Sequence, residues 1–214
     1  MTKNHFTVQE LIDIHLEAGI VPDAKYHYQW DDLANWQLET LKQQGITANS
    51  KLLDIGCGSL RFGLRAIDFL ESGNYFGIDA FENYIGIGKK LAKKALPNKI
   101  YEVVLSNQFE FAKFNTIFDY ALAQSVFTHL SLSQIELCLK NLKLVLNQNG
   151  KFIFTYITSQ TPYGFLYFGI EPMRFGAKCN DTFLEFTCKQ YGLKFEKLNI
   201  EHPTGQNVGL IMQA

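Results

Sequence analysis

The 214-residue sequence has almost no net charge, few cysteines and no long apolar run. Its formal net charge of -1 gives no electrostatic case for nucleic-acid binding. Cys57, Cys138, Cys179 and Cys188 form no C-x-x-C pair and no metal-type spacing with histidine. We therefore expect no metal and a reduced, cytoplasmic setting. With no signal peptide and no apolar run of about 18 residues, we also expect no membrane segment.

The composition is that of a folded globular chain. Hydrophobic residues make up 47% and charged residues 19%, and the length suits one domain. Residues 1–50 have helical periodicity, interrupted by Gly19 and Pro22. We expect an N-terminal helical cap over residues 1–50 and one globular domain over residues 51–214.

A strand that runs into a glycine turn is the most informative stretch. Leu52, Leu53 and Ile55 form a short apolar run that suits a strand covered on both faces. Gly56 and Gly58 follow, where the backbone turns sharply before the next helix. The first N–H groups of that helix face the turn. The pattern predicts a ligand with a negative or hydrogen-bond-accepting group, or else an ordinary strand-turn-helix corner.

A second strand supports the ligand interpretation. Residues 74–79 form another apolar run, which ends in Asp79. This spacing of about 20 residues places a carboxylate at the end of the neighbouring parallel strand, beside the first turn. Such a carboxylate accepts hydrogen bonds from both hydroxyls of a ribose. A ligand that contains a nucleoside would explain Gly56, Gly58 and Asp79 together.

The third glycine of a dinucleotide-binding G-x-G-x-x-G motif is missing, because Arg61 occupies its place. An NAD-dependent enzyme is therefore disfavoured. Residues 54–58 (Asp-Ile-Gly-Cys-Gly) and 75–79 (Tyr-Phe-Gly-Ile-Asp) instead resemble the first two motifs of class I S-adenosylmethionine-dependent methyltransferases. The resemblance covers residues 52 to 214 and also includes residues 118–130.

The resemblance implies an α/β, Rossmann-like fold. It is a doubly wound, mostly parallel sheet of seven strands in the order 3-2-1-4-5-7-6, with helices on both faces. The final hairpin supplies the antiparallel strand. The resemblance also implies S-adenosyl-L-methionine as cofactor. Its binding residues would be Asp54, Gly56, Cys57, Gly58, Asp79, Ala80, Asn107, Phe109 and Gln124.

Within that set, the roles differ. Asp54 would hold the cofactor's ammonium directly or through a water. Asn107, with Ser106 as a rival, and Phe109 would meet the adenine, and Gln124 would lie against the methionine portion. His129 is a weak catalytic candidate because a histidine can take a proton from an acceptor. The alternative is that His129 begins a helix and bonds to backbone.

Aromatic segments are candidates for the acceptor side. Tyr26, Tyr28 and Trp30 would line the acceptor pocket by resemblance, or would simply pack helices on the sheet edge. The irregular stretch 158–178, which includes Tyr163, would border the acceptor site or contact a second subunit. Two further features are a turn expected at Asn149-Gly150 and residues 202–206 (His-Pro-Thr-Gly-Gln). The latter resemble a motif of some bacterial methyltransferases and carry no assigned chemistry.

The predicted function is direct transfer of a methyl group to a small-molecule or sugar acceptor. The alternative is a non-catalytic S-adenosylmethionine-binding protein of the same fold. The sequence does not identify the acceptor, and it contains no indication of oligomeric state.

Overall fold

The computed structural model describes residues 6–20, 30–159, 168–170 and 174–214. Side chains of residues 168–170 and 174–176 are not described. Seven strands form the main sheet: β1 (Leu52–Ile55), β2 (Tyr75–Asp79), β3 (Glu102–Leu105), β4 (Phe118–Ala123), β5 (Leu146–Tyr156), β8 (Leu193–Leu198) and β9 (Asn207–Gln213). The helices are α1 (Val8–Glu17), α3 (Trp30–Gln43), α4 (Arg61–Phe69), α5 (Glu82–Ala95), α6 (Leu132–Lys143) and α7 (Asp181–Gln190).

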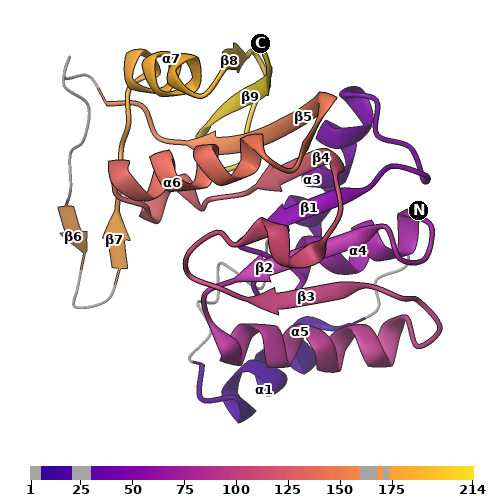
Figure 1. Cartoon of the computed structure of the whole chain (residues 1–214). Coiled ribbons are helices and arrows are strands. Elements are labelled where there is room, and N and C mark those ends of the chain that lie inside the picture. The colour runs from indigo at the N-terminus through magenta and orange to yellow at the C-terminus, as the bar shows by residue number, and fades with distance from the viewer. Residues whose placement is uncertain (1–5, 21–29, 160–167, 171–173) are drawn as a thin grey trace.

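The main sheet has the strand order β3-β2-β1-β4-β5-β9-β8 (Figure 1). Neighbours are parallel from β3 to β5, and β9 is antiparallel to both β5 and β8. This confirms the expected order 3-2-1-4-5-7-6 and the Rossmann-like fold. The strand order reverses between β1 and β4, which is where open α/β sheets bind their ligands.

Helices cover both faces of the sheet, and each face has a separate hydrophobic core beneath its helices. One core joins α1, α3, α4 and α5 to the sheet, and the other joins α6, α7 and the short 3-10 helix η1 (Phe111–Phe114). Successive strand residues point to opposite faces. Leu52 and Ile153 therefore lie in the first core, whereas Leu53 and Phe152 lie in the second.

The N-terminal helices are part of this packing. Thr7 and Glu10 form a capping box at the start of α1, and Leu11 is buried in the first core. The side chains of Lys94 on α5 and Glu10 form an ion pair of 2.9 Å, and α1 lies near α5 in Figure 1. From α3, Leu38 and Leu41 reach the same core as β1. Residues 6–20 and 30–50 thus pack directly on the sheet domain.

Two local expectations are wrong. Asn149-Gly150 is no turn: both residues belong to β5, where the pairing with β4 shifts register between Phe118 and Tyr120. The chain has already reversed at residues 144–145. The stretch 158–178 is not irregular throughout, because β6 (Phe168–Ile170) and β7 (Arg174–Gly176) pair as an antiparallel ladder. This ladder lies apart from the main sheet in Figure 1.

Among the described helices, none combines the length and the apolarity needed to cross a membrane.

Candidate functional site

The turn after β1 requires glycine for two reasons. Gly56 and Gly58 have φ of 72° and 54°, in the left-handed region that disfavours other residues. A Cβ atom on Gly56 would lie 2.5 Å from Cγ2 of Val126, in the loop after β4. The backbone N–H groups of Gly56 and Cys57 donate to the Ile78 carbonyl at 2.8 and 3.1 Å. The turn is therefore held against the ends of both β2 and β4.

Asp79 at the end of β2 is bound to the same turn. Its Oδ2 accepts the Gly58 N–H at 2.8 Å, and its Oδ1 accepts the Phe81 N–H at 2.9 Å. The residue is 9% exposed, and burial raises the pKa of its carboxyl despite these hydrogen bonds. Each carboxylate oxygen has a further lone pair with which to accept a ligand hydroxyl. The expected proximity of Asp79 to the glycine turn is thus present in the structure.

Asp54 lies inside the fold at the end of β1, 3% exposed. Burial raises its carboxyl pKa to about 7, opposed by a 2.6 Å hydrogen bond from the Tyr75 hydroxyl to Oδ2. The charge of Asp79 raises this pKa further, and that of Arg61 lowers it. A bound cation would favour the ionised form of such a carboxyl. The site therefore contains a carboxyl group that a cationic ligand can ionise.

Strained backbone is concentrated in the loops that surround this turn. Of the non-glycine residues described, Leu60, Phe109, Asn115 and Ser125 have positive φ, with values of 60°, 52°, 47° and 57°. Leu60, Phe109 and Ser125 belong to the loops after β1, β3 and β4. Such strain persists where surrounding structure enforces it, which is frequent at ligand sites.

The structure distributes the remaining cofactor candidates unevenly. Ala80 directly follows Asp79, and the Ser106 N–H after β3 donates to the Asp79 carbonyl at 2.9 Å. The Asn107 side chain is exposed in that loop, whereas Phe109 is 9% exposed and packs in the second core. Gln124 directly follows β4, and its amide lies 3.0 Å from the Ser125 hydroxyl.

His129 ends the 3-10 helix η2 (Phe127–His129). Its backbone N–H donates to the Val126 carbonyl at 2.9 Å, and its side chain is exposed. The catalytic role of His129 stays a prediction.

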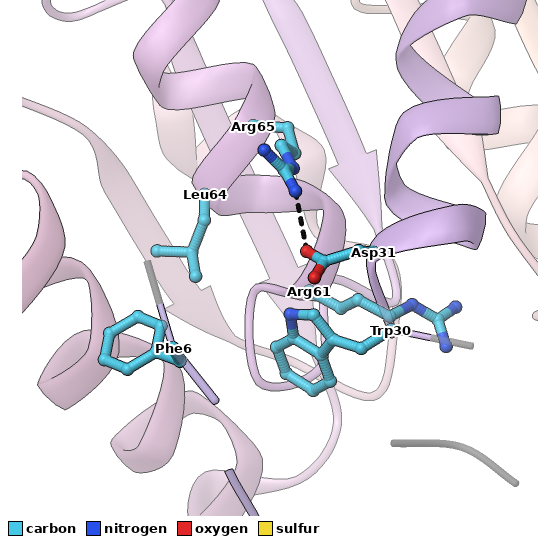
Figure 2. Close-up of a pocket in the computed structure, with 6 residues that line it drawn as sticks. All are labelled: Phe6, Trp30, Asp31, Arg61, Leu64 and Arg65. Atoms are coloured by element: carbon cyan, nitrogen blue, oxygen red, sulfur yellow. Dashed lines mark hydrogen bonds and ion pairs between the residues drawn. The ribbon is translucent and has the colours of Figure 1, made fainter. Parts of the chain in front are cut away.

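Trp30 is the one acceptor candidate that the described residues include, because Tyr26, Tyr28 and Tyr163 lie outside them. It is 4% exposed and meets His15 edge-to-face at 5.8 Å between ring centroids. This burial favours the packing alternative for Trp30. Trp30 lines a cavity of about 10 Å³, enough for about one water. Figure 2 shows the residues around this cavity. The cavity is lined by Phe6, Trp30, Asp31, Arg61, Leu64 and Arg65.

That cavity adjoins the first turn of α4 and does not include Asp54 or Asp79. In Figure 2, Arg65 is turned towards Asp31, and their ion pair measures 2.6 Å. Within the described residues, no group of three His, Cys, Asp or Glu side chains is placed to hold a metal ion.

Sequence reasoning missed three contacts at the site. Tyr75 fixes Asp54 from the start of the neighbouring strand. His15, buried on α1, lies 3.1 Å from the Ser59 hydroxyl in the glycine turn. His202, in the loop before β9, lies 2.8 Å from the Gln124 amide. His15 follows Leu11 by one helical turn on the apolar face, which was the available signal for a buried polar contact.

Comparison with known proteins identifies the family. The model of the methyltransferase domain family matches residues 46–202, and the chain therefore belongs to this family. A demethylmenaquinone methyltransferase of Bacillus mycoides is 27% identical over 161 residues, covering 72% of this chain and 67% of that protein.

Solved structures show the same fold. The magnesium protoporphyrin IX methyltransferase ChlM of Synechocystis PCC 6803, crystallised with S-adenosylhomocysteine, has a TM-score of 0.69 at 10% identity. That match covers 96% of this chain and 95% of ChlM. An S-adenosylmethionine-dependent methyltransferase of Clostridium acetobutylicum has a TM-score of 0.66 at 11% identity, covering 96% and 97%. The fold is that of class I methyltransferases, as the sequence motifs predicted.

Proposed function

We propose that this methyltransferase transfers the methyl group of S-adenosylmethionine to a small-molecule acceptor. The observation that carries the proposal is the pair of buried carboxyls, Asp54 and Asp79, at the ends of neighbouring strands beside one glycine turn. Asp79 is bonded to that turn through the Gly58 N–H. Class I enzymes need an ammonium partner and a ribose partner, and this arrangement offers one of each.

The cofactor residues follow from that placement. Asp79 accepts the ribose hydroxyls, Asp54 attracts the ammonium of the methionine portion, and residues 56–58 let the cofactor approach the backbone. Cys57 and Ala80 border it through their backbone, while Gln124 lies on the methionine side. Asn107 and Phe109 belong to the adenine side, where the Asn107 amide is exposed and Phe109 is buried.

The reaction is a direct displacement. The acceptor's nucleophilic atom forms a bond to the methyl carbon as the methyl-sulfur bond breaks, and the positive sulfonium becomes a neutral thioether. The proton of an acceptor hydroxyl is released to solvent. A site that aligns the two reactants supplies most of the acceleration, and exclusion of water prevents competing hydrolysis. An acceptor that is already nucleophilic needs no base, so the proposal does not depend on His129.

The chemical class of the acceptor is a more specific part of the proposal. The curated relatives are named for demethylmenaquinone, and ChlM is named for a porphyrin, so both names point to aromatic ring compounds. The 14% aromatic content of this chain suits such an acceptor. We propose a hydroxylated aromatic molecule as the first class to test, with a sugar as the alternative.

We also propose that residues 1–50 act as a cap on the methyltransferase domain at 51–214. The contacts that support this role are the His15–Ser59 approach of 3.1 Å and the Asp31–Arg65 ion pair. The first contact joins α1 to the turn before α4, and the second joins α3 to α4 itself.

The test is transfer of a radiolabelled methyl group from S-adenosylmethionine to a naphthalenediol, a monosaccharide and a primary amine in parallel. The proposal predicts label in the naphthalenediol, and less label with an Asp79→Asn variant when the cofactor is below saturation, because that variant binds it more weakly. Label in the sugar alone would replace the acceptor class. Cofactor binding without transfer to any acceptor would favour a non-catalytic binding protein.

A further inference from the structure

A polar cluster joins the loop after β4 to the loop between β8 and β9. Gln124 and Ser125 come from the first loop, and His202 and Gln206 come from the second. The Gln124 Nε2 position lies 2.8 Å from His202 Nε2 and 3.0 Å from Ser125 Oγ. Gln206 Nε2 donates to the same Ser125 hydroxyl at 2.8 Å. These contacts place the previously unassigned residues 202–206 beside a cofactor candidate.

The position of Ser125 within this cluster is rigid. Its backbone N–H donates to the Thr155 hydroxyl at 2.7 Å, and its carbonyl accepts from the Thr128 hydroxyl at 2.8 Å. These two hydrogen bonds hold Ser125 at its positive φ of 57°. The amides of Gln124 and Gln206 therefore meet a fixed hydroxyl group.

His202 is an uncharged ring in this setting. It is 4% exposed, and the Trp36 ring meets it edge-to-face at 4.5 Å between centroids. Burial lowers its pKa to about 4, and the positive charge of Arg61 lowers it further. The imidazole is therefore neutral at neutral pH and carries one proton, on one of its two nitrogens.

The backbone decides which nitrogen carries that proton. The Thr204 N–H donates to His202 Nδ1 at 3.1 Å, so Nδ1 has a free lone pair and the proton is on Nε2. An Nε2–H group must face an acceptor. Oxygen and nitrogen of a side-chain amide are assigned from such hydrogen bonds, so the Gln124 oxygen belongs at the position 2.8 Å from His202.

This assignment turns the Gln124 NH₂ group to the other side. The atom at that other position is buried and has no hydrogen-bond partner among the described residues. With the oxygen towards His202, the Ser125 hydroxyl also donates to Gln124 and accepts from Gln206. His202, Ser125 and the Gln124 oxygen are then paired, whereas the Gln206 Oε1 atom stays buried with no partner among the described residues. The two N–H donors of Gln124 remain for a ligand.

The donors lie at the methionine side of the proposed cofactor site. Gln124 directly follows β4, which pairs with β1, and Val126 lies against Gly56. Arg61, in the first turn of α4, influences the pKa values of both Asp54 and His202, so these groups share one end of the sheet. Asp54 offers a partner for the cofactor's ammonium there, and the cofactor's carboxylate needs a donor.

We propose that His202 is a positioning residue that holds the Gln124 amide as a hydrogen-bond donor to the carboxylate of bound S-adenosylmethionine. The proposal rests on the function proposed above. It gives residues 202–206 a role: His202 in the loop between β8 and β9 fixes the orientation of the Gln124 amide, 78 positions away in the chain and directly after β4.

The test compares two ligands and two variants by calorimetry. The ligands are S-adenosylhomocysteine and its decarboxylated analogue, which keeps the ammonium. His202→Phe keeps a ring against Trp36 and removes the donor. It should bind S-adenosylhomocysteine about three- to tenfold more weakly, the usual worth of one hydrogen bond. Its affinity for the decarboxylated analogue should be unchanged. His202→Gln places an amide N–H near the position of Nε2 and should restore binding.

The outcomes separate the two proposals. Failure of the unaltered protein to bind S-adenosylhomocysteine would overturn the proposed function, and with it this inference. Normal binding by His202→Phe, or an equal loss for both ligands, would overturn the inference alone. Long-range proton-nitrogen NMR of the unaltered protein supplies an independent measurement. A protonated Nε2 and an unprotonated Nδ1 in His202 are expected, and the reverse tautomer would overturn the assignment.

Discussion

At the scale of single residues, Asp54 combines deep burial with an ionisable group. Its pKa of about 7 in the folded protein compares with about 3.9 in an unfolded chain. Between these values the folded state holds a proton that the unfolded state has released. The contribution of Asp54 to the unfolding free energy is therefore full below about pH 4 and falls as pH rises through about 7.

The ammonium group of a bound ligand reverses this preference, which gives the first prediction. Binding of S-adenosylhomocysteine should ionise Asp54 and release its proton. The affinity should rise by up to about tenfold per unit as pH increases towards about 7, and then level off. Calorimetry in two buffers of different ionisation enthalpy measures the proton release. An affinity independent of pH, or proton uptake, would contradict the assignment, and Asp54→Asn should abolish the pH dependence.

Asp79 gives a second prediction at this scale. Asp79→Asn keeps the shape but leaves fewer acceptors for the Gly58 and Phe81 N–H groups and for the ribose. The affinity for S-adenosylhomocysteine should fall by about 1–3 kcal/mol. Asp68→Asn is the control, because this carboxyl lies exposed on α4. If both variants bind normally, the ribose assignment is wrong.

The sequence was informative about individual residues where spacing along the chain determines proximity. Gly58 follows β1 and Asp79 ends β2, the next strand along the chain. Parallel pairing of these two strands brings the two residues together. The contact between Gln124 and His202 depends instead on how β9 inserts between β5 and β8. Likewise, the donation from Tyr75 to Asp54 depends on rotamers within the core. Motif spacing contains neither kind of information.

At the scale of elements, the glycine turn is tested by comparison with a second glycine. Gly73 also has positive φ, of 92°, but a Cβ there would meet nothing within 4 Å. Gly73→Ala should lower the unfolding free energy by about 1–2 kcal/mol through backbone strain alone. Gly56→Ala adds the 2.5 Å approach to Val126 and should cost at least about 1 kcal/mol more. Urea denaturation measures the unfolding free energy of each variant. Equal losses would show that the close approach of Gly56 to Val126 does not affect stability.

The attachment of α3 to α4 supplies another matched pair. Asp31 and Asp32 both lie in the first turn of α3 and interact alike with its dipole. The 5% exposed side chain of Arg65 pairs with Asp31, whereas Asp32 is exposed. Asp31→Asn should lower the unfolding free energy by about 1–3 kcal/mol, and Asp32→Asn by less than about 0.5 kcal/mol. Thermal unfolding measures the stability of the two variants. Equal melting temperatures would refute a stabilising role for the ion pair.

Element boundaries show where local sequence signals suffice. The helices over Val8–Glu17 and Leu132–Lys143 begin at Thr7 and Ser131, each with a capping box. Asn149-Gly150 looked like a turn, yet the chain reversed earlier and these residues extended β5. Leu146 and Lys151 pair with β4 on either side of the dipeptide, which lies within the register shift of this pairing.

At the scale of the whole molecule, the site is assembled from segments far apart in the chain. The glycine turn after β1 contacts the last residue of β2, and the residue after β4 contacts the loop before β9. Strands β1 and β4 are neighbours where the strand order reverses. The seven-strand order could be predicted because a few motifs resemble those of a family whose members share that order. The acceptor did not follow, because it depends on surfaces that differ among proteins of one fold.

Calorimetric titration with S-adenosylhomocysteine, with NAD as the control ligand, tests the central claim most directly. The account predicts micromolar binding of S-adenosylhomocysteine and no binding of NAD, because Arg61 replaces the third glycine of a dinucleotide turn. Binding of NAD, or of neither ligand, would contradict the assignment of Asp54, Asp79 and the glycine turn to S-adenosylmethionine.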